Sequence, residues 1–247
     1  MNLPRPSAAA RHALAPTAAL RTGINLSNFL LVSTKSDEGE PDGVSPAIAR
    51  ALGEQLGVPI ELVFFDNPGE VADAATENRW DIGNIGADPA RSEHIAFSPA
   101  YSQIECTYLV RQDSPIRSMN EVDRPGIRVV SKERAAYTLV LERDLQNAEL
   151  IQTASIDGAF EAFIDDDLDV LAGLLPRLLS DADALPGARI LDGSFATVQQ
   201  AIGTPRDRDP AGVQYLDEFV SAAIASGLVA DLIEHYQVVG LSAAPRP

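Results

Sequence analysis

Short apolar runs alternate with amphipathic stretches along the first hundred residues of the chain. Runs of this length, bounded by Gly, Pro and Asn, are typical of buried strands. Apolar residues recur every four positions from Ile48 to Leu56 and predict a helix. Ser45 is its expected N-cap, with Pro46 at the first helical position and Gly57 at its end. The expected elements are strands at 20–26, 58–65 and 81–87 and helices at 45–56 and from Asn67-Pro68 onward.

A second pattern of the same kind follows the break at Asp113-Ser114-Pro115. One more strand and two amphipathic helices then close the chain, and we expect these two helices to return to the first half. The expected elements are strands at 104–111, 127–131, 149–152, 168–172, 188–191 and 196–202, and helices at 139–145, 156–164, 175–179, 211–226 and 229–237.

Strands that alternate with helices at short spacing predict an α/β protein, with two parallel or mixed sheets flanked by helices. The larger lobe would be discontinuous and comprise residues 20–110 and 196–240, and the smaller lobe would span 114–192. Two strand crossings, near 109–114 and 192–198, would form a hinge beside a cleft.

The stretch from Trp80 to Tyr101 carries the clearest candidate for chemistry. Gly83 and Gly86 remove side chains from its buried strand, so another group can approach the backbone there. The strand breaks at Asp88-Pro89, and Arg91 follows at once. A guanidinium in this place can form two parallel hydrogen bonds with a carboxylate.

The position of Arg91 in the predicted sheet supports a role in ligand binding. Ligands of parallel sheets bind beyond the carboxyl ends of the strands, and the turns at 27–30 and 88–91 both lie there. The alternative is that Arg91 pairs with a surface residue such as Glu93, and the sequence leaves it open.

Composition excludes several classes of function. The chain of 247 residues has a formal net charge of -17, and phosphate binding needs a basic face, so we expect no nucleic-acid partner. Cys106 is the one cysteine and lies in an apolar run, which is typical of a small buried residue. The three histidines are scattered, so we expect no metal site and no cofactor. No apolar run has transmembrane length.

The beginning of the chain gives little information on location. Residues 1–19 are rich in Ala, Pro and Arg and are expected to form a flexible lead-in. They do not have the pattern of a secretory signal. The protein would be periplasmic if a signal segment was removed, and cytoplasmic if the chain starts at Met1 as written.

Several short segments stand in a characteristic order along the chain. They are Gly43-Val44-Ser45, Trp80-Asp81-Ile82 leading to Asp88-Pro89-Ala90-Arg91, Ile95 to Tyr101, Gly126 to Val129, Ala136-Tyr137, Asp167 to Ala172 and Ala225 to Val229. In this order they resemble the type 2 periplasmic binding proteins, in the family 3 branch of amino-acid-binding components of ABC importers. The resemblance covers about residues 20 to 240. It implies the two-lobed fold of that family, a monomer that closes over a small ligand, and importer membrane subunits as partners.

The resemblance also assigns roles to residues of the candidate turns. Arg91 would hold the ligand's carboxylate, Asp88 stands where the family usually has an assisting Thr or Ser, and Phe29 lies near the family's aromatic wall. Backbone N–H groups of the turn at 134–137 would meet the same carboxylate at a helix N-terminus. The expected ligand-binding residues are Asn28, Phe29, Gly86, Asp88, Arg91, Arg134, Ala135, Ala136 and Leu174.

The chain departs from the family pattern at the expected contacts of the smaller lobe. Arg134 and Ala135 stand where the family prefers Gly and a hydroxyl, and Leu174 stands where amino-acid binders place the acid that receives the ligand's ammonium. We therefore expect a small carboxylate ligand, an amino acid or a related organic acid; an ammonium group would lack its best partner unless Asp88 or Glu133 serves. Arg134 would add a positive charge for a dicarboxylate or remain a solvated turn residue.

An enzymatic alternative exists on the same fold. Cyclohexadienyl dehydratases share it, and their chemistry needs a general acid in the cleft. The candidates are Glu133, Asp88 and Glu105, and none stands in a catalytic motif. We expect a binding protein without catalytic residues, and a ligand sensor is a further alternative.

Overall fold

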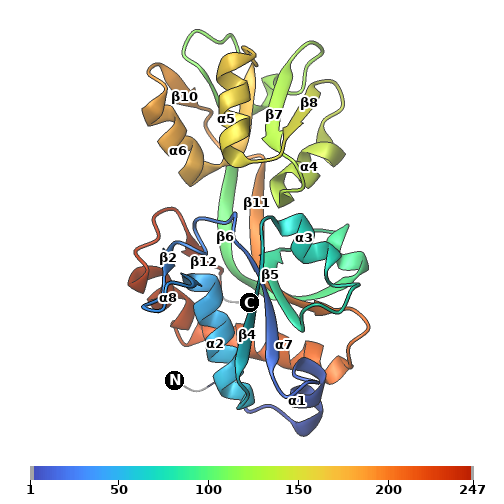
Figure 1. Cartoon of the computed structure of the whole chain (residues 1–247). Coiled ribbons are helices and arrows are strands. Elements are labelled where there is room, and N and C mark those ends of the chain that lie inside the picture. Colours follow the sequence, from blue (N-terminus) through green and yellow to red (C-terminus); the bar gives the residue numbers. More distant parts are fainter. Residues whose placement is uncertain (1–2, 246–247) are drawn as a thin grey trace. The chain divides into compact units, whose positions relative to one another are not determined.

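Strands covered by helices form both halves of the chain in the computed structural model, which describes residues 3–245 (Figure 1). The chain divides into two units. Unit 1 comprises the residues up to Gln103 and those from Gln199 onward, and unit 2 is Ile104–Val198. The predicted fold class, a mixed α/β protein with helices flanking its sheet, is confirmed.

The elements follow the predicted alternation. In unit 1 they are α1 (Ala8–Leu14), β1 (Leu20–Asn25), β2 (Thr34–Lys35), β3 (Pro41–Asp42), α2 (Val44–Leu56), β4 (Ile60–Phe65), α3 (Pro68–Asp73), β5 (Ile82–Gly86), η1 (Arg91–Glu93), α7 (Pro210–Ala225), α8 (Leu228–His235) and β12 (Ser242–Ala243). In unit 2 they are η2 (Met119–Glu121), β7 (Arg128–Lys132), α4 (Ala136–Asp144), β8 (Glu149–Thr153), α5 (Ile156–Asp165), β9 (Val170–Leu174), α6 (Leu175–Ala184) and β10 (Ala188–Ile190).

Two long strands, β6 (Ile95–Arg111) and β11 (Ala196–Pro205), run through both units. They join the strands into one hydrogen-bonded order, β4-β1-β5-β11-β6-β9-β7-β8, instead of the two separate sheets that we expected. β6 begins well before the predicted residue 104, so the first crossing lies inside this strand, at Gln103, and not at 109–114. The second crossing lies inside β11, between Val198 and Gln199.

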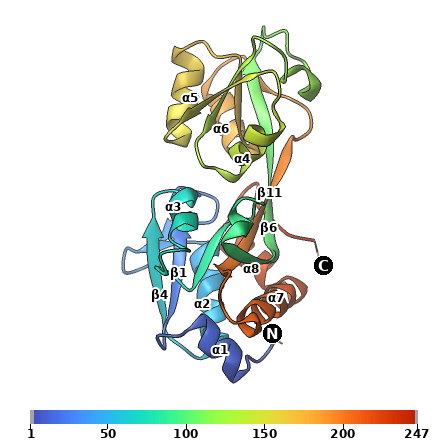
Figure 2. The ribbon, with the colours of Figure 1, turned by 90° about the vertical axis from the view of Figure 1, so that its right-hand side faces the viewer.

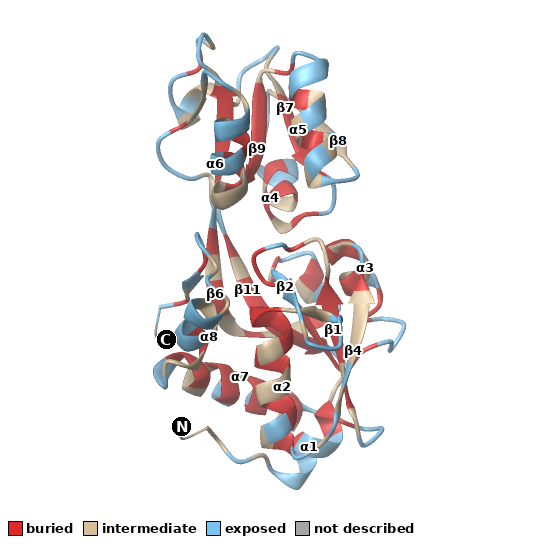
Figure 3. Ribbon diagram, turned by 60° about the vertical axis from the view of Figure 1, so that its left-hand side comes forward, coloured by how far each residue is buried: buried red, intermediate tan, exposed pale blue. Residues whose placement is uncertain are grey.

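Trp80 organises one side of unit 1. Its ring is fully buried and its Nε1 donates a hydrogen bond to Val71 O at 2.8 Å. A Cβ atom at Gly23 would lie 2.9 Å from Trp80 Cδ1, and one at Gly83 would lie 3.1 Å from Trp80 Cζ2. The close approach predicted at Gly83 is therefore made by the Trp80 ring, since only glycine leaves room for it. Figure 3 shows the neighbouring β1 as mostly buried and β4 as half-buried, as expected for the last strand of the order.

The expectation of a flexible lead-in over residues 1–19 is wrong for α1. This helix has Ser7 as its N-cap, and Ala10, Ala13 and Leu14 form a buried stripe along it. The stripe packs on α7, which lies beside α1 in Figure 2. Gly212 permits a close approach, because a Cβ atom there would lie 2.9 Å from Ala13 Cβ. Short alanine-rich segments are weak helices alone, so tertiary packing stabilises this one.

The start of α2 also differs from the prediction. The N-cap is Gly43, with a positive φ of 149°, and not Ser45. A Cβ atom at Gly43 would lie 2.5 Å from Leu31 O, so the chain passes too closely here for any other residue. Ser45 lies within the helix and instead receives two hydrogen bonds from Asn84 Nδ2, on its carbonyl and hydroxyl oxygens.

Unit 2 has apolar clusters on both faces of its strands. Val129 and Val170 belong to one cluster, and Val130 and Leu171 belong to the other. This alternation follows from the pleat of paired parallel strands, since β7 and β9 pair Val129 with Val170 and Val130 with Leu171. The unit therefore holds its own core.

Candidate functional site

The predicted turns of unit 1 lie at the carboxyl ends of its parallel strands. β1 pairs in parallel with β5, with Ile24 opposite Asn84, so the carboxyl ends of both strands lie side by side. The turn after β1 carries Asn28 and Phe29, and the turn after β5 carries Asp88 and Arg91. The structure thus brings together the residues that the sequence predicted for this lobe.

Arg91 is buried at this edge, with 7% of its surface exposed. Its Nη1 donates a hydrogen bond of 2.7 Å to Gly86 O, the last residue of β5. Glu93, the surface partner considered above, is exposed. The guanidinium is therefore directed along the carboxyl end of β5, where the sequence analysis placed it.

Asp88 begins the same turn and is also buried, with 5% exposure. Its Oδ1 accepts a hydrogen bond from Ala90 N at 2.9 Å, and its carbonyl oxygen accepts from Ser92 N at 3.0 Å. These bonds fix Asp88 on the turn that carries Arg91, three positions further along the chain. Two buried residues of opposite charge are thus held on one short turn, whose Pro89 and Ala90 are exposed.

The turn after β1 is fixed by two asparagines. Asn28 is buried and its Oδ1 accepts from Leu30 N at 3.3 Å, whereas the Phe29 ring is partly exposed. Asn25, which the sequence analysis did not single out, accepts hydrogen bonds from the Ser27 backbone at 3.1 Å and from its hydroxyl at 2.8 Å. Side chains that bond their own backbone in this way are typical of tight turns.

In unit 2 the predicted residues also lie at the carboxyl ends of neighbouring parallel strands. β7 and β9 are parallel neighbours, and the turn that carries Arg134 and Ala135 follows β7, while Leu174 ends β9. Arg134 has a positive φ of 58°, and Ala135 is the N-cap of α4 without a side-chain hydrogen bond. Ala136 is the first residue of the helix. The first N–H groups of α4 therefore donate no hydrogen bond to the cap side chain, which favours an anion there.

Lys132 is a cation that the sequence analysis missed. It ends β7 and only 4% of its surface is exposed. Its carbonyl oxygen accepts a hydrogen bond from Thr138 Oγ1, and this hydroxyl also contacts Ser131 Oγ at 2.6 Å. A lysine at the end of an apolar strand run, just before a turn, was the available signal.

Acid and nucleophile candidates are sparse. Glu105 and Glu133 are exposed, so only Asp88 of the three proposed acids is buried. Cys106 is buried, as predicted, and burial raises the pKa of its thiol to about 12. A thiol with this pKa stays protonated and is a poor nucleophile. Within residues 3–245, no group of three or more His, Cys, Asp or Glu side chains is arranged to hold a metal ion.

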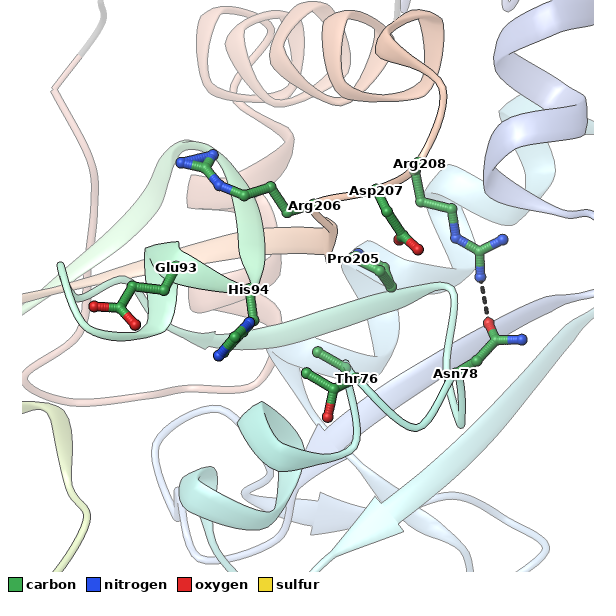
Figure 4. Close-up of a pocket in the computed structure, with 9 residues that line it drawn as sticks. Thr76, Asn78, Glu93, His94, Pro205, Arg206, Asp207 and Arg208 are labelled. Atoms are coloured by element: carbon green, nitrogen blue, oxygen red, sulfur yellow. Dashed lines mark hydrogen bonds between the residues drawn. The ribbon is translucent and has the colours of Figure 1, made fainter.

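A surface pocket of about 700 Å³ lies elsewhere in unit 1 (Figure 4). Asn78 precedes β5 and Pro205 ends the antiparallel β11, so these residues place the pocket at the amino end of β5. Glu93 and His94, which follow Arg91 directly in η1 and its cap, also line it. Arg208 lies in the pocket wall, and its Nη2 donates a hydrogen bond of 2.7 Å to Asn78 Oδ1. Its lining contains both acidic and basic side chains and none of the predicted ligand-binding residues.

Two α/β units joined by two through-running strands define the class of this protein, the type 2 periplasmic-binding-protein fold. The solved structure of the solute receptor for L-cysteine of Neisseria gonorrhoeae superposes with a TM-score of 0.75 at 17% identity, over 95% of this chain and 99% of that one. The chain belongs to the bacterial extracellular solute-binding proteins, family 3, whose model matches residues 20–239.

Two curated relatives are distant. Cyclohexadienyl dehydratase of Pseudomonas aeruginosa is 24% identical over 214 residues, which cover 83% of this chain and 77% of that protein. The amino-acid-binding protein AabA of Dichelobacter nodosus is 22% identical over 161 residues, 64% of each chain. No helix within residues 3–245 is long and apolar enough to cross a membrane.

Proposed function

We propose that this chain is a solute-binding protein that captures a small carboxylate-bearing ligand, an amino acid or a related organic acid, at the carboxyl end of β5 in unit 1. The observation that carries the proposal is the buried Arg91 at the carboxyl end of β5, in a chain of the solute-binding family. A guanidinium that is shielded from water binds a carboxylate more strongly than an exposed one, because less solvent screens the two charges.

The second unit would complete the site. The N–H groups at the start of α4 have no cap side chain as acceptor and would attract an anion, and the positive φ of Arg134 belongs to the turn before the helix. The family resemblance predicts that the ligand first meets Arg91 and that a closing movement of unit 2 then follows. Only the closed form offers both sets of contacts, so ligand binding shifts the population toward it.

Delivery to an ABC importer is the role that the family supports. An extracellular family and a structural relative that is a receptor for L-cysteine agree with a periplasmic location and with importer membrane subunits as partners. The binding protein itself would act as a monomer.

The test is a thermal-shift screen over amino acids, dicarboxylates and aromatic acids. A ligand at about 100 times its Kd should stabilise the wild type by about 2.7 kcal/mol. Arg91→Ala should abolish this stabilisation, and Arg91→Lys, which keeps the charge but not the planar guanidinium, should reduce it. Arg79→Ala is the matched control, because Arg79 is an exposed arginine of the same unit. An undiminished ligand shift in the folded Arg91→Ala protein would refute the assignment.

A second candidate function is that of a dehydratase, which the match to cyclohexadienyl dehydratase favours. Asp88 would be its general acid, since it is the one buried carboxylate among the three candidates. Incubation with prephenate or arogenate, followed by absorbance, separates the two functions. We expect stabilisation of the protein by some ligands and no turnover of either substrate.

A further inference from the structure

We propose that Ser45, Asn84 and Tyr101 bind one internal water molecule in the core of unit 1. All three residues have at most 2% of their surface exposed. A buried water typically makes about three hydrogen bonds to buried polar groups, and each of these side chains offers one such group. The site does not depend on the proposed function, because a water bound in the core needs no solute.

The amide of Asn84 leaves one buried oxygen for this water. Its Nδ2 donates hydrogen bonds of 3.0 Å to the carbonyl oxygen and to the hydroxyl oxygen of Ser45. A carbonyl oxygen can only accept, so the nitrogen must face Ser45, and Oδ1 is directed elsewhere. Among the described residues, this buried Oδ1 has no hydrogen-bond partner. An acceptor buried without a donor is costly, so we expect a donor here.

The hydroxyl of Tyr101 is a second buried group of this kind. Burial raises its pKa, so the hydroxyl stays protonated and can donate a hydrogen bond. The Ser45 side chain lies near enough to act against this rise in the pKa, yet within residues 3–245 no hydrogen bond reaches the Tyr101 oxygen. Two neighbouring hydroxyls without a direct bond can be joined by a water that lies between them.

The strand order explains why these side chains do not satisfy one another directly. Asn84 lies in β5 and Tyr101 lies in β6, and β11 runs between these two strands. Strands two places apart are separated by about 10 Å, so the two side chains can meet only above β11. The β11 residue opposite Asn84 is Ile202, whose side chain has no hydrogen to donate. Ser45 approaches from the first turn of α2 and is therefore the one polar side chain that links them.

One water balances the donors and acceptors of this site. Ser45 Oγ already accepts from Asn84 Nδ2, so the hydrogen of this hydroxyl is left to donate elsewhere. The water would donate one hydrogen to Asn84 Oδ1 and accept one from each of the hydroxyls of Ser45 and Tyr101. All three groups are uncharged, so a neutral water fits them better than an ion, whose charge would be buried without a partner.

Two measurements on the whole chain detect the water. A high-resolution crystal structure should show it within hydrogen-bond distance of Asn84 Oδ1 and Tyr101 Oη. In solution, magnetic relaxation dispersion of water counts long-lived internal water molecules, and Tyr101→Phe should lower this count by about one. Tyr215→Phe is the matched control, because Tyr215 is also buried and its hydroxyl donates directly to Pro4 O at 3.0 Å. The control should leave the count unchanged.

Urea unfolding separates a hydrated hydroxyl from an unsatisfied one. If a water bonds the Tyr101 hydroxyl, Tyr101→Phe removes a hydrogen bond and should raise the unfolding equilibrium constant by about 2- to 10-fold, as Tyr215→Phe should. If the hydroxyl is buried without a partner, phenylalanine removes an unsatisfied group, and the constant should fall. Such a fall, or an unchanged count of internal waters in Tyr101→Phe, would overturn the proposal. So would a crystal structure in which Tyr101 bonds Ser45 directly with no water between them.

Discussion

An arginine and an aspartate link two parallel strands in each unit, and the two pairs differ mainly in burial. In unit 1, Asp81 Oδ2 accepts from Arg21 N and Nε, both at 3.0 Å. In unit 2, Asp169 Oδ2 accepts from Arg128 N at 2.8 Å and from Nε at 3.3 Å. Asp81 has no exposed surface, whereas the Asp169 side chain is 34% exposed. The same substitution should therefore have different costs in the two units.

The structure sets the magnitude for Asp81→Asn. Oδ1 of Asp81 also accepts from Arg21 Nη2 at 2.8 Å and from Arg208 Nη2 at 2.9 Å, so each oxygen receives two bonds. The amide of asparagine keeps one acceptor oxygen, which removes two bonds and the charge that both guanidinium groups face. At about 1.5–3 kcal/mol for a bond to a charged group, and with a reduction because both arginines reach solvent, we expect a loss of about 2–4 kcal/mol. Asp169→Asn should cost at most about 1 kcal/mol, because water screens its pair.

Urea unfolding measures both values. Trp80 is the one tryptophan of the chain and lies next to Asp81, so its fluorescence reports unit 1. Circular dichroism follows both units, which need not unfold together. Asp169→Asn is the matched control for the loss of an acid at a strand start. Equal costs for the two variants, or a cost below about 1 kcal/mol for Asp81→Asn, would refute the argument from burial.

Two further predictions concern stability. Leu14→Ala should lower the free energy of unfolding by about 2–5 kcal/mol, because Leu14 is fully buried where α1 packs on α7. Leu179→Ala, at a largely exposed leucine, is the control and should lower it far less. Equal shifts of the melting temperature in the two variants would show that α1 does not pack in solution. Burial acts to raise the pKa of Asp42, but hydrogen bonds from Arg50 and the Gly43 backbone lower it overall. An acid with a lowered folded pKa contributes stability above its unfolded pKa of about 4 and loses this contribution as the pH falls through the folded pKa. Asp42→Asn should therefore reduce the fall in the free energy of unfolding at acid pH, measured by urea unfolding at a series of pH values. An unchanged pH dependence would contradict this.

Sequence reasoning recovered most elements, since their signals are local. Asn67 caps α3 and Gly57 ends α2 in the left-handed conformation, as predicted, because each residue acts through its own backbone. The predictions were wrong where a contact with a distant segment of the chain determines the local structure. Gly43 becomes the cap because Leu31 O lies against it, and α1 forms because α7 covers it. No local pattern contains those contacts.

The same contrast between local signals and distant contacts applies to the candidate site. The turn that carries Arg91 was found because a glycine-rich strand, a proline and a cation stand in one short stretch. The burial of Lys132 was missed because a charged residue in a strand normally predicts exposure, and only the packed unit shows otherwise. The ligand-binding roles of all the expected residues are predictions: Asn28, Phe29, Gly86, Asp88, Arg91, Arg134, Ala135, Ala136 and Leu174.

The amino ends and the carboxyl ends of the parallel strands have different physical tasks, and this explains where the chain places its charges. At the amino ends of the strands, Asp81 and Asp169 each bind the arginine of a neighbouring strand, so charge there fixes strand register. At the carboxyl ends, Arg91 donates a hydrogen bond to the Gly86 carbonyl oxygen, and the first turn of α4 has no side-chain cap. Substitutions at the amino ends should therefore change stability with little effect on ligand affinity, and those at the carboxyl ends should change ligand affinity with little effect on stability. Asp81→Asn and Asp88→Asn, both at buried acids of unit 1, test this separation directly.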